Sequence, residues 1–163
     1  MKKITYLFLP LTLLAMFATA CSDNVLFEDE RTFDNTTWNR FTPEKFELTA
    51  KNTDEFYDFF VTVVIDTTRY RLKSLPLNIN LYSPQGERRM FPSTVTLQAH
   101  TGQWKGTFDG SKITCRQRIR DCFCFNCEGD HKVEIGQATH YYDIVGIQSI
   151  TFSVEKTELE YPH

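Results

Sequence analysis

The chain has 163 residues, of which 41% are hydrophobic and 14% aromatic, including 14 phenylalanines. This composition excludes a disordered polar chain, and the length suits one domain with a core rather than two. The formal net charge is −3, and it becomes −5 when Lys2 and Lys3 are left out. An acidic balance argues against a nucleic-acid-binding protein, because such proteins normally carry a basic excess.

Residues 1–20 have the three parts of a secretory signal peptide. Lys2 and Lys3 form a positive start, residues 4–18 are mostly apolar, and small residues precede Cys21. The alternative is a transmembrane anchor, but the apolar run contains Pro10 and is shorter than the ~20 residues that a membrane span needs. We therefore predict a signal peptide over residues 1–20.

Residues 14–21, LAMFATAC, resemble the lipobox of bacterial lipoproteins, although Ala18 replaces the usual leucine. The resemblance implies that the sulfur of Cys21 takes a diacylglycerol; leaving Cys21 aside, the chain has an even four cysteines. Acyl chains contribute ~0.8 kcal/mol per buried CH₂, so an acylated cysteine holds a soluble domain on a membrane. The alternative is an ordinary thiol in a secreted protein.

The segment after Cys21 is polar, and we assign residues 21–36 to a lipidated tether. Asp23 and the acidic residues 28–30 partly resemble the surface-export signal of Bacteroidetes lipoproteins, while a solvated tether explains them equally well. Two locations follow for the lipid-anchored chain in the cell envelope, the periplasmic face of a membrane and the cell surface.

Alternation of apolar and polar residues predicts strand after strand from Trp38 onward. The run 59–65 is nearly all apolar, as expected for a strand covered on both faces, and 77–81 alternates cleanly before the turn residues 83–86. The other expected strands are 46–50, 88–91, 94–98, 113–125, 131–135 and 147–154, with 102–110 as a loop or short edge strand. We predict an all-β fold, a single antiparallel β-sandwich of the immunoglobulin-like or jelly-roll type with roughly eight strands over residues 37–158. We assign residues 159–163 to a C-terminal tail.

Four cysteines lie close together in the sequence, at Cys115, Cys122, Cys124 and Cys127. Two disulfides are the favoured interpretation, because the space outside the inner membrane is oxidising. The pairing is either 115–122 with 124–127 or 115–124 with 122–127. Free thiols, a zinc site helped by His131 and a redox pair of Cys124 with Cys127 are the alternatives.

The remaining polar residues show no catalytic pattern. The four histidines, His100, His131, His140 and His163, stand apart from any metal-binding or nucleophile motif, and a solvated turn accounts for the acidic residues 54, 55 and 58. We therefore predict a non-enzymatic protein without a cofactor or a metal.

Four aromatic residues are candidates for an exposed binding surface: Trp38, Trp104, Tyr141 and Tyr142. Stacking on a glycan or contact with a protein partner is the functional interpretation, and packing in the core or at a sheet edge is the alternative. Tyr141 and Tyr142 are adjacent, so on a strand only one of them can face inward.

Several short motifs together resemble the GldH-type gliding-motility lipoproteins of Bacteroidetes. They are the lipoprotein signal ending at Cys21, WNRF at 38–41, the strand and turn at 77–86, GQWKG at 102–106, IGQA at 135–138, IVGI at 144–147 and ITF at 150–152. The resemblance covers most of the mature chain, and the cysteine cluster departs from the family pattern.

The resemblance implies a membrane-attached accessory component of the gliding machinery and, through it, of type IX secretion. It implies an envelope protein complex as the partner, and it supplies no catalytic residues. The alternative is a cell-surface lipoprotein that binds a glycan or a protein through its exposed aromatic residues.

Overall fold

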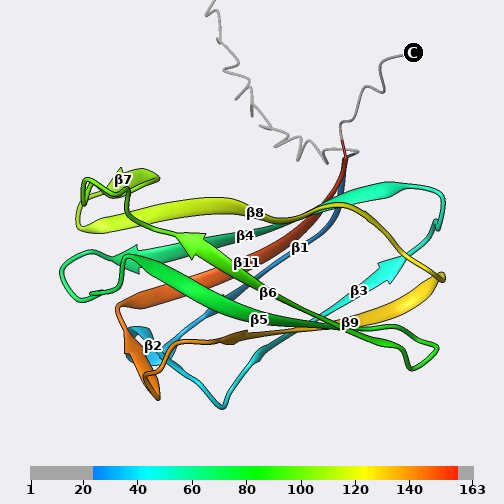
Figure 1. Ribbon diagram of the computed structural model, residues 1–163, viewed down its shortest axis with the longest axis horizontal. Coiled ribbons are helices and arrows are strands. Elements are labelled where there is room, and N and C mark those ends of the chain that lie inside the picture. The colour runs from blue at the N-terminus through cyan, green and yellow to red at the C-terminus, as the bar shows by residue number, and fades with distance from the viewer. Residues whose placement is uncertain (1–23, 158–163) are drawn as a thin grey trace, which may run out of the picture.

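The computed structural model describes residues 24–157, which form two stacked antiparallel sheets and a two-stranded ribbon (Figure 1). The five-stranded sheet has the order β1 (Val25–Thr32), β11 (Ile147–Lys156), β4 (Phe56–Asp66), β8 (Lys112–Cys124) and β7 (Thr107–Asp109). The four-stranded sheet has the order β3 (Glu44–Ala50), β9 (Gly129–Gln137), β5 (Ser74–Tyr82) and β6 (Arg88–Thr96). The ribbon pairs β2 (Thr37–Asn39) with β10 (Asp143–Val145), beside the short 3₁₀ turn η1 (Asp34–Thr36).

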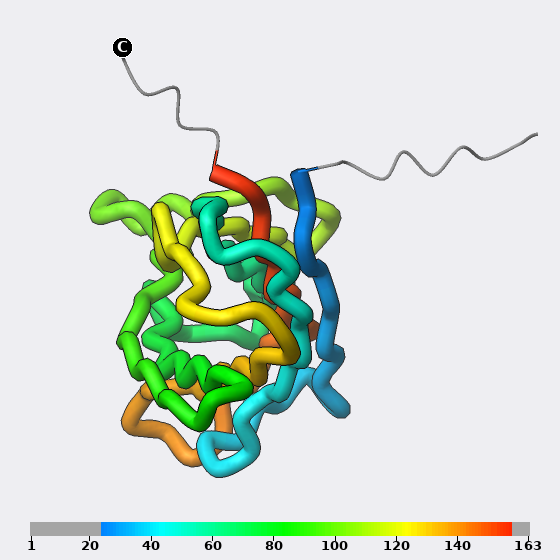
Figure 2. The backbone as a smooth tube through the Cα atoms, turned by 90° about the vertical axis from the view of Figure 1, so that its right-hand side faces the viewer, coloured from blue at the N-terminus to red at the C-terminus, as the bar shows by residue number. Residues whose placement is uncertain are grey.

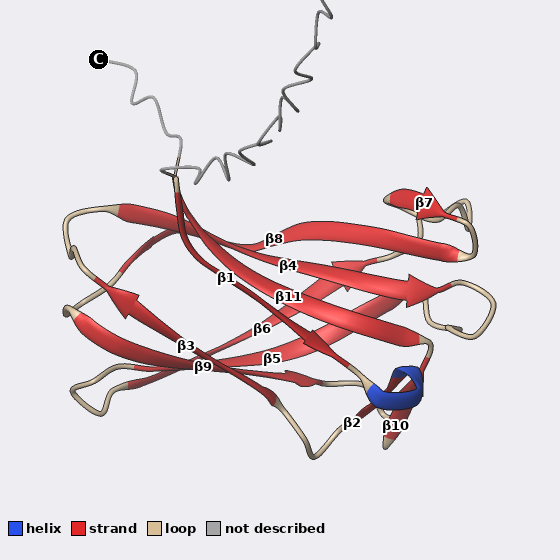
Figure 3. Cartoon of the chain, turned by 180° about the vertical axis from the view of Figure 1, so that it is seen from behind, coloured by secondary structure: helices blue, strands red, loops and turns tan. Residues whose placement is uncertain are grey.

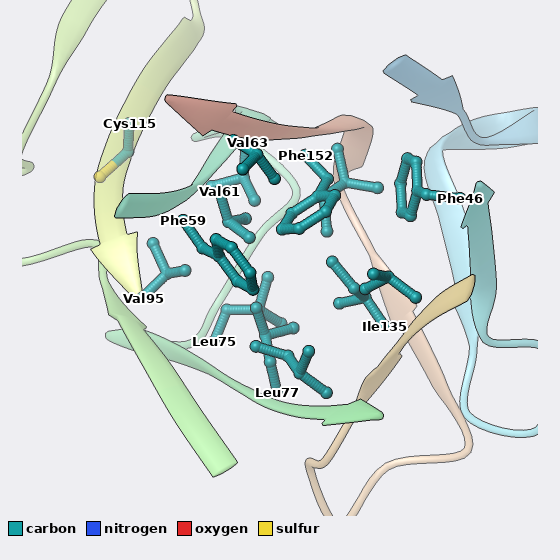
Figure 4. Close-up of a cluster of buried hydrophobic side chains, with 14 of the residues drawn as sticks. Phe46, Phe59, Val61, Val63, Leu75, Leu77, Val95, Cys115, Ile135 and Phe152 are labelled. Atoms are coloured by element: carbon teal, nitrogen blue, oxygen red, sulfur yellow. The ribbon is translucent and has the colours of Figure 1, made fainter. Parts of the chain in front are cut away.

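The core is the layer of side chains between the two sheets. Every second residue of β4 and of β5 is fully buried, as with Val61 and Val63 from one sheet and Leu75 and Leu77 from the other (Figure 4). Phe59 lies at the centre of this layer, and its ring contacts the rings of four residues: Phe91, Phe123, Phe125 and Phe152. The phenylalanine surplus therefore fills the gap between the sheets.

The predicted antiparallel β-sandwich is confirmed. Eight strands have seven residues or more, and β2, β7 and β10 have three each, which is too short for an alternating pattern to show. The predicted tether over residues 21–36 differs from the structure, because residues 25–32 form β1 and pair with β11 along their length. Their acidic composition reflects the exposed outer side of an edge strand. The signal peptide, Cys21 and residues 159–163 lie outside the described residues.

Two side chains connect the sheets along the two open sides of the sandwich. On one side Gln117 of β8 imitates a peptide unit, because its Nε2 donates to the carbonyl of Thr94 at 2.7 Å and its Oε1 accepts from the amide of Thr96 at 2.8 Å. On the other side Nη2 of Arg31 in β1 donates to the carbonyl of Lys45 in β3 at 3.0 Å. These bonds use backbone groups of the edge strands β6 and β3 that would otherwise face water.

Both described ends of the chain lie together at one end of the sandwich, which we call the entry end (Figure 2). There the amide of Lys156 donates to the carbonyl of Asn24 at 2.8 Å. From this point β1 runs eight residues, about 26 Å at ~3.3 Å per residue, toward the ribbon at the opposite end, the distal end (Figure 3). Within residues 24–157 no helix is long and apolar enough to cross a bilayer.

Gly146 joins three segments at the distal end. Its amide donates to the carbonyl of Thr36, and its carbonyl accepts from the amide of Asp66, both at 2.8 Å. The backbone has φ +94°, and a Cβ added here would lie 2.5 Å from the amide nitrogen of Tyr70. Only glycine fits, because both the left-handed conformation and the close backbone approach exclude a side chain.

We predict that Gly146→Ala lowers the free energy of unfolding by roughly 2–4 kcal/mol, through backbone strain and the clash with Tyr70. Gly86→Ala is the matched control, because Gly86 has φ +87° but nothing within 4 Å of an added Cβ. The control should lose only the strain, about 1 kcal/mol. Urea unfolding of the two variants measures the difference, and equal losses would contradict the packing role of Gly146.

Candidate partner-binding surface

Four exposed apolar side chains gather at the distal end, and we call them the distal aromatic surface: Phe41, Tyr141, Tyr142 and Val145. They are 70%, 48%, 68% and 41% exposed, respectively. The rings of Phe41 and Tyr142 lie 5.8 Å apart between centroids at a 34° tilt, and the ring of Tyr141 packs on that of His140 at 3.9 Å. Tyr141 and Val145 line one hollow beside this pair. Exposed apolar residues that gather in one region mark an interaction site more often than scattered ones do.

A buried side-chain network fixes the loop that carries both tyrosines. Gln137 is 3% exposed, and its Nε2 donates to the carbonyls of Tyr141 at 3.0 Å and Tyr142 at 3.3 Å. Its Oε1 accepts from the amide of Thr139 at 2.9 Å and from the hydroxyl of Thr139 at 2.7 Å. Because the loop is ordered before a partner arrives, binding costs little loop entropy.

The ribbon holds Phe41 beside Tyr142. Nδ2 of Asn39 donates to Oδ1 of Asp143 at 2.7 Å, and Oδ1 of Asn39 accepts from the amide of Phe41 at 2.9 Å. The amide of Arg40 donates to the carbonyl of Tyr142 at 2.7 Å. These hydrogen bonds position the backbone that carries the two exposed rings, so the arrangement of the rings does not depend on their own attraction.

A strained turn borders the distal aromatic surface. Asn35 and Thr36 both have φ 54°, and the left-handed region is an outlier for a β-branched residue such as threonine. Nη1 of Arg69 stabilises the turn by donating to Oγ1 of Thr36 at 2.7 Å. Strain of this kind concentrates at functional sites, which is consistent with a binding role for the distal end.

A hollow of about 230 Å³ opens beside Tyr141. It is lined by Arg69, Arg71, Leu72, Tyr141, Asp143, Ile144 and Val145. Its floor includes the buried Ile144, and its rim carries the exposed guanidinium groups of Arg69 and Arg71. Arg71 has no ion-pair partner within residues 24–157. The hollow therefore combines an apolar floor with two arginines and one carboxylate, that of Asp143, which leaves an excess of positive charge.

The two tryptophans are not part of this surface. Trp38 is 1% exposed, stacks on Phe33 at 5.0 Å, and donates Nε1 to the carbonyl of Thr42 at 3.1 Å. Its prediction as a binding residue is wrong, because the ribbon turns its side chain into the core. Trp104 is half-buried and packs against the core, next to its backbone bridge with Gln98. Only the two tyrosines of the predicted set lie at the distal aromatic surface.

The predicted set of binding residues does not include Phe41, Val145 or the two arginines. Phe41 stands outside any alternating run, between Arg40 and Thr42, two residues before Pro43. A lone aromatic residue in a turn is a signal that could have indicated an exposed ring. Nothing local in the sequence places Arg69 beside Thr36, since the two residues meet only through the fold.

The predicted disulfides are not formed, because Cys115, Cys122, Cys124 and Cys127 are all free thiols. Strand β8 carries Cys115 and Cys124 nine residues apart, roughly 30 Å, whereas a disulfide joins Cα atoms within about 7 Å. The other three thiols lie in different environments. Cys122 is exposed, Cys124 donates to the carbonyl of Thr53 at 2.8 Å, and Cys127 is buried.

The buried thiols have structural environments rather than metal-binding ones. Sγ of Cys127 lies 3.9 Å from Nε2 of His131, whose Nδ1 lies 3.0 Å from the carbonyl of Gly129. Within residues 24–157 no group of three or more His, Cys, Asp or Glu side chains is placed to hold a metal ion. Burial raises the pKa of the Cys115 thiol, which lowers its reactivity.

Asp58 differs from the solvated residue that the sequence suggests. It is 6% exposed, and its carboxylate accepts from Nη1 of Arg118, the amide of Cys122 and the hydroxyl of Thr157, each at 2.9 Å. Burial by itself would raise the pKa of Asp58, but these hydrogen bonds outweigh it and hold the pKa below its usual range. Asp58 therefore joins β4, β8 and the end of β11 as a charged group.

The model of the GldH lipoprotein family matches residues 25–154, a range that contains both sheets and the distal aromatic surface. The chain belongs to the GldH lipoprotein family. It is therefore a lipoprotein associated with gliding motility and held in the cell envelope by a lipid anchor. This membership brings no catalytic class with it.

Two solved structures show distant likeness to this GldH-family chain. The structure of infectious bursal disease virus Gx strain is 13% identical over 85% of this chain, with a TM-score of 0.32, and the match spans only 31% of that chain. The Tobacco streak virus coat protein dimer is 9% identical over 83% of this chain and 89% of that chain, with a TM-score of 0.22. No curated protein matches the chain.

We predict four titratable thiols in the mature chain carrying Cys21→Ser. Cys122 should react first with a thiol reagent in the folded state because it is exposed, and Cys115 should react only on unfolding because it is buried. The melting temperature should be the same with and without reductant. Fewer than four thiols in the unfolded chain, or a melting temperature lowered by reductant, would restore the disulfide interpretation.

Proposed function

We propose that this GldH-family lipoprotein is a non-enzymatic accessory subunit of the gliding and type IX secretion machinery, and that it binds a protein partner through the distal aromatic surface. The observation that carries the proposal is the placement of this surface at the end of the sandwich opposite the chain's entry. Cys21 precedes Asn24 by three residues, so a lipid on Cys21 would hold the entry end near the membrane. The distal end would then face away from the membrane, toward other envelope proteins.

The chemistry of the distal aromatic surface favours a protein partner. Tyrosine and arginine are among the residue types that dominate binding energy at protein interfaces, and here Tyr141 stands beside Arg69 and Arg71. The matching partner has an apolar side chain for the floor of the hollow and carboxylates for its basic rim. A glycan is the second candidate, supported by the exposed rings of Phe41 and Tyr142, on which a sugar can stack.

The partner test uses the full-length lipidated chain with Phe41→Ala and Tyr142→Ala combined. Both side chains are about two-thirds exposed or more, so the fold should persist, and a partner should be lost on co-purification from solubilised membranes. Surface spreading of the cells should fall with it. The matched control is Phe108→Ala with Met90→Ala, which removes comparably exposed apolar side chains from β7 and β6.

The two outcomes of this test are distinct. Unchanged spreading and an unchanged set of co-purified proteins in the double variant would refute the distal aromatic surface as the binding site. Glycan binding by the purified chain on an array, abolished by Tyr142→Ala, would replace the protein partner with the glycan alternative.

Anchoring through Cys21 has its own test. Cys21→Ala should move the chain from the membrane fraction to the soluble fraction, because a stable attachment requires the acyl chains. The domain itself should keep its melting temperature. Unchanged membrane retention of the Cys21→Ala chain would contradict lipid attachment at this residue.

A further inference from the structure

The outer face of the five-stranded sheet, away from the core, carries a regular arrangement of charge. Cross-strand register places Glu28 of β1, Ser153 of β11, Phe60 of β4 and Arg118 of β8 in one row. The next row has Glu30, Thr151, Thr62 and Arg116 in the same strand order. In both rows, therefore, β1 supplies a glutamate, β11 a hydroxyl residue, β4 the central residue and β8 an arginine.

The arginines of this face keep donors for an outside partner. The guanidinium carbon of Arg116 lies over the ring of Phe60, 3.8 Å from the ring centroid, and its Nη2 contacts Glu155 at 2.6 Å. Arg118 uses Nη1 on Asp58. Their side chains are 47% and 56% exposed, and a guanidinium has five N–H donors, so most donors of each remain directed to solvent.

The glutamates of β1, at the edge of the same face, are not paired with basic residues of the described chain. Glu28 and Glu30 are exposed, and neither has an ion-pair partner within residues 24–157. A hollow of about 390 Å³ lies on the same face near the entry end, between the end of β11, β4 and β8. It is lined by Asn24, Asp58, Phe60, Arg116, Arg118, Glu155, Lys156 and Thr157. The face thus presents unpaired carboxylates on β1 and, across β11 and β4, a recess into which β8 places Arg116 and Arg118.

We propose that this face pairs with the same face of a second copy of the chain, around a twofold axis parallel to the strands. Such an axis reverses the strand order between the two copies. It places β1 of each copy over β8 of the other copy, and β4 of each copy over β11 of the other copy. Glu30 then meets Arg116 of the second copy, and Glu28 meets Arg118 at the recess. The bulky Phe60 faces the recessed Ser153, which is 3% exposed.

The choice of axis follows from the topology. A twofold axis parallel to the strands keeps both entry ends on the same side, so two anchored copies can share one membrane. An in-plane axis perpendicular to the strands would place the entry ends at opposite sides and would set β1 on β1, with like charges facing each other. The inference rests on the charged rows and holds whether or not the distal aromatic surface binds a partner.

The dimensions of the face predict weak, reversible pairing. Four strands about 4.8 Å apart and about eight residues long cover roughly 500 Å² in projection per copy, the low end for a specific interface. Attachment of both copies to one membrane would raise their effective concentration and favour the pair.

Charge reversal and complementation test the pairing in the mature chain carrying Cys21→Ser. Sedimentation velocity at up to about 100 µM, where weak interfaces associate, should show a dimer. Glu30→Arg alone and Arg116→Glu alone should each weaken it by about tenfold or more, because each opposes like charges across the axis. An equimolar mixture of the two variants should recover a heterodimer, since both contacts become attractive again.

The matched controls reverse the same charges on the outer face of the four-stranded sheet, with Glu47→Arg and Lys45→Glu. They should leave the dimer unchanged, and thermal melts should show that all variants are folded. If Arg116→Glu does not fold, Arg116→Gln takes its place, with a smaller weakening expected. A monomeric parent chain, or a mixture without a heterodimer, would overturn the proposal. A monomer that binds phosphatidylglycerol vesicles and loses this binding with Arg116→Glu would overturn it as well, by assigning the face to the membrane.

Discussion

Burial of β4 between β11 and β8 is the constraint on which the rest of the structure depends. Its inner residues Phe59, Val61, Val63 and Ile65 are completely buried, and Phe59 contacts rings from both sheets. Each ring that Phe59 touches comes from a different strand or from the end of β8, so a single side chain connects the layers. The sheets cannot slide against each other without breaking this cluster, because closely packed rings fit in few arrangements.

Both surfaces for which binding is proposed lie at the periphery of this rigid centre. The distal aromatic surface lies on the ribbon and on the loop that Gln137 holds, and neither belongs to the two main sheets. The charged rows lie on the outer face of the five-stranded sheet, where side chains are free to vary without affecting the core. A β-sandwich of this kind can therefore present two separate surfaces, one at its end and one on its face.

The sequence predicted the main strands because their inner faces are buried in a period of two, as in 59–65 and 77–81. It placed β1 in a tether because an edge strand with acidic outer residues looks like a solvated segment. It could not reveal the bulge of β8, where a register shift turns Arg120 toward the ring of Phe91 and away from the face of Arg116 and Arg118. Bulges follow from packing against a neighbouring strand and leave no local pattern.

The candidate site was predictable only in part, for the same reason. Tyr141 and Tyr142 are adjacent in the sequence, and this alone predicted that at least one of the two side chains is exposed. Trp38 is buried because it stacks on Phe33 and because β2 pairs with β10. The two strands of this ribbon are more than a hundred residues apart in the sequence. The close spacing of the four cysteines suggested a covalent framework, but an extended strand separates Cys115 from the other three.

The free thiols also bear on how the protein matures. Its core closes through hydrocarbon side chains and through the amide of Gln117, with no covalent bond between sheets. Such a domain needs no electron acceptor and no thiol oxidase to reach its final form. Its folding after export can therefore proceed at the same rate with and without oxygen.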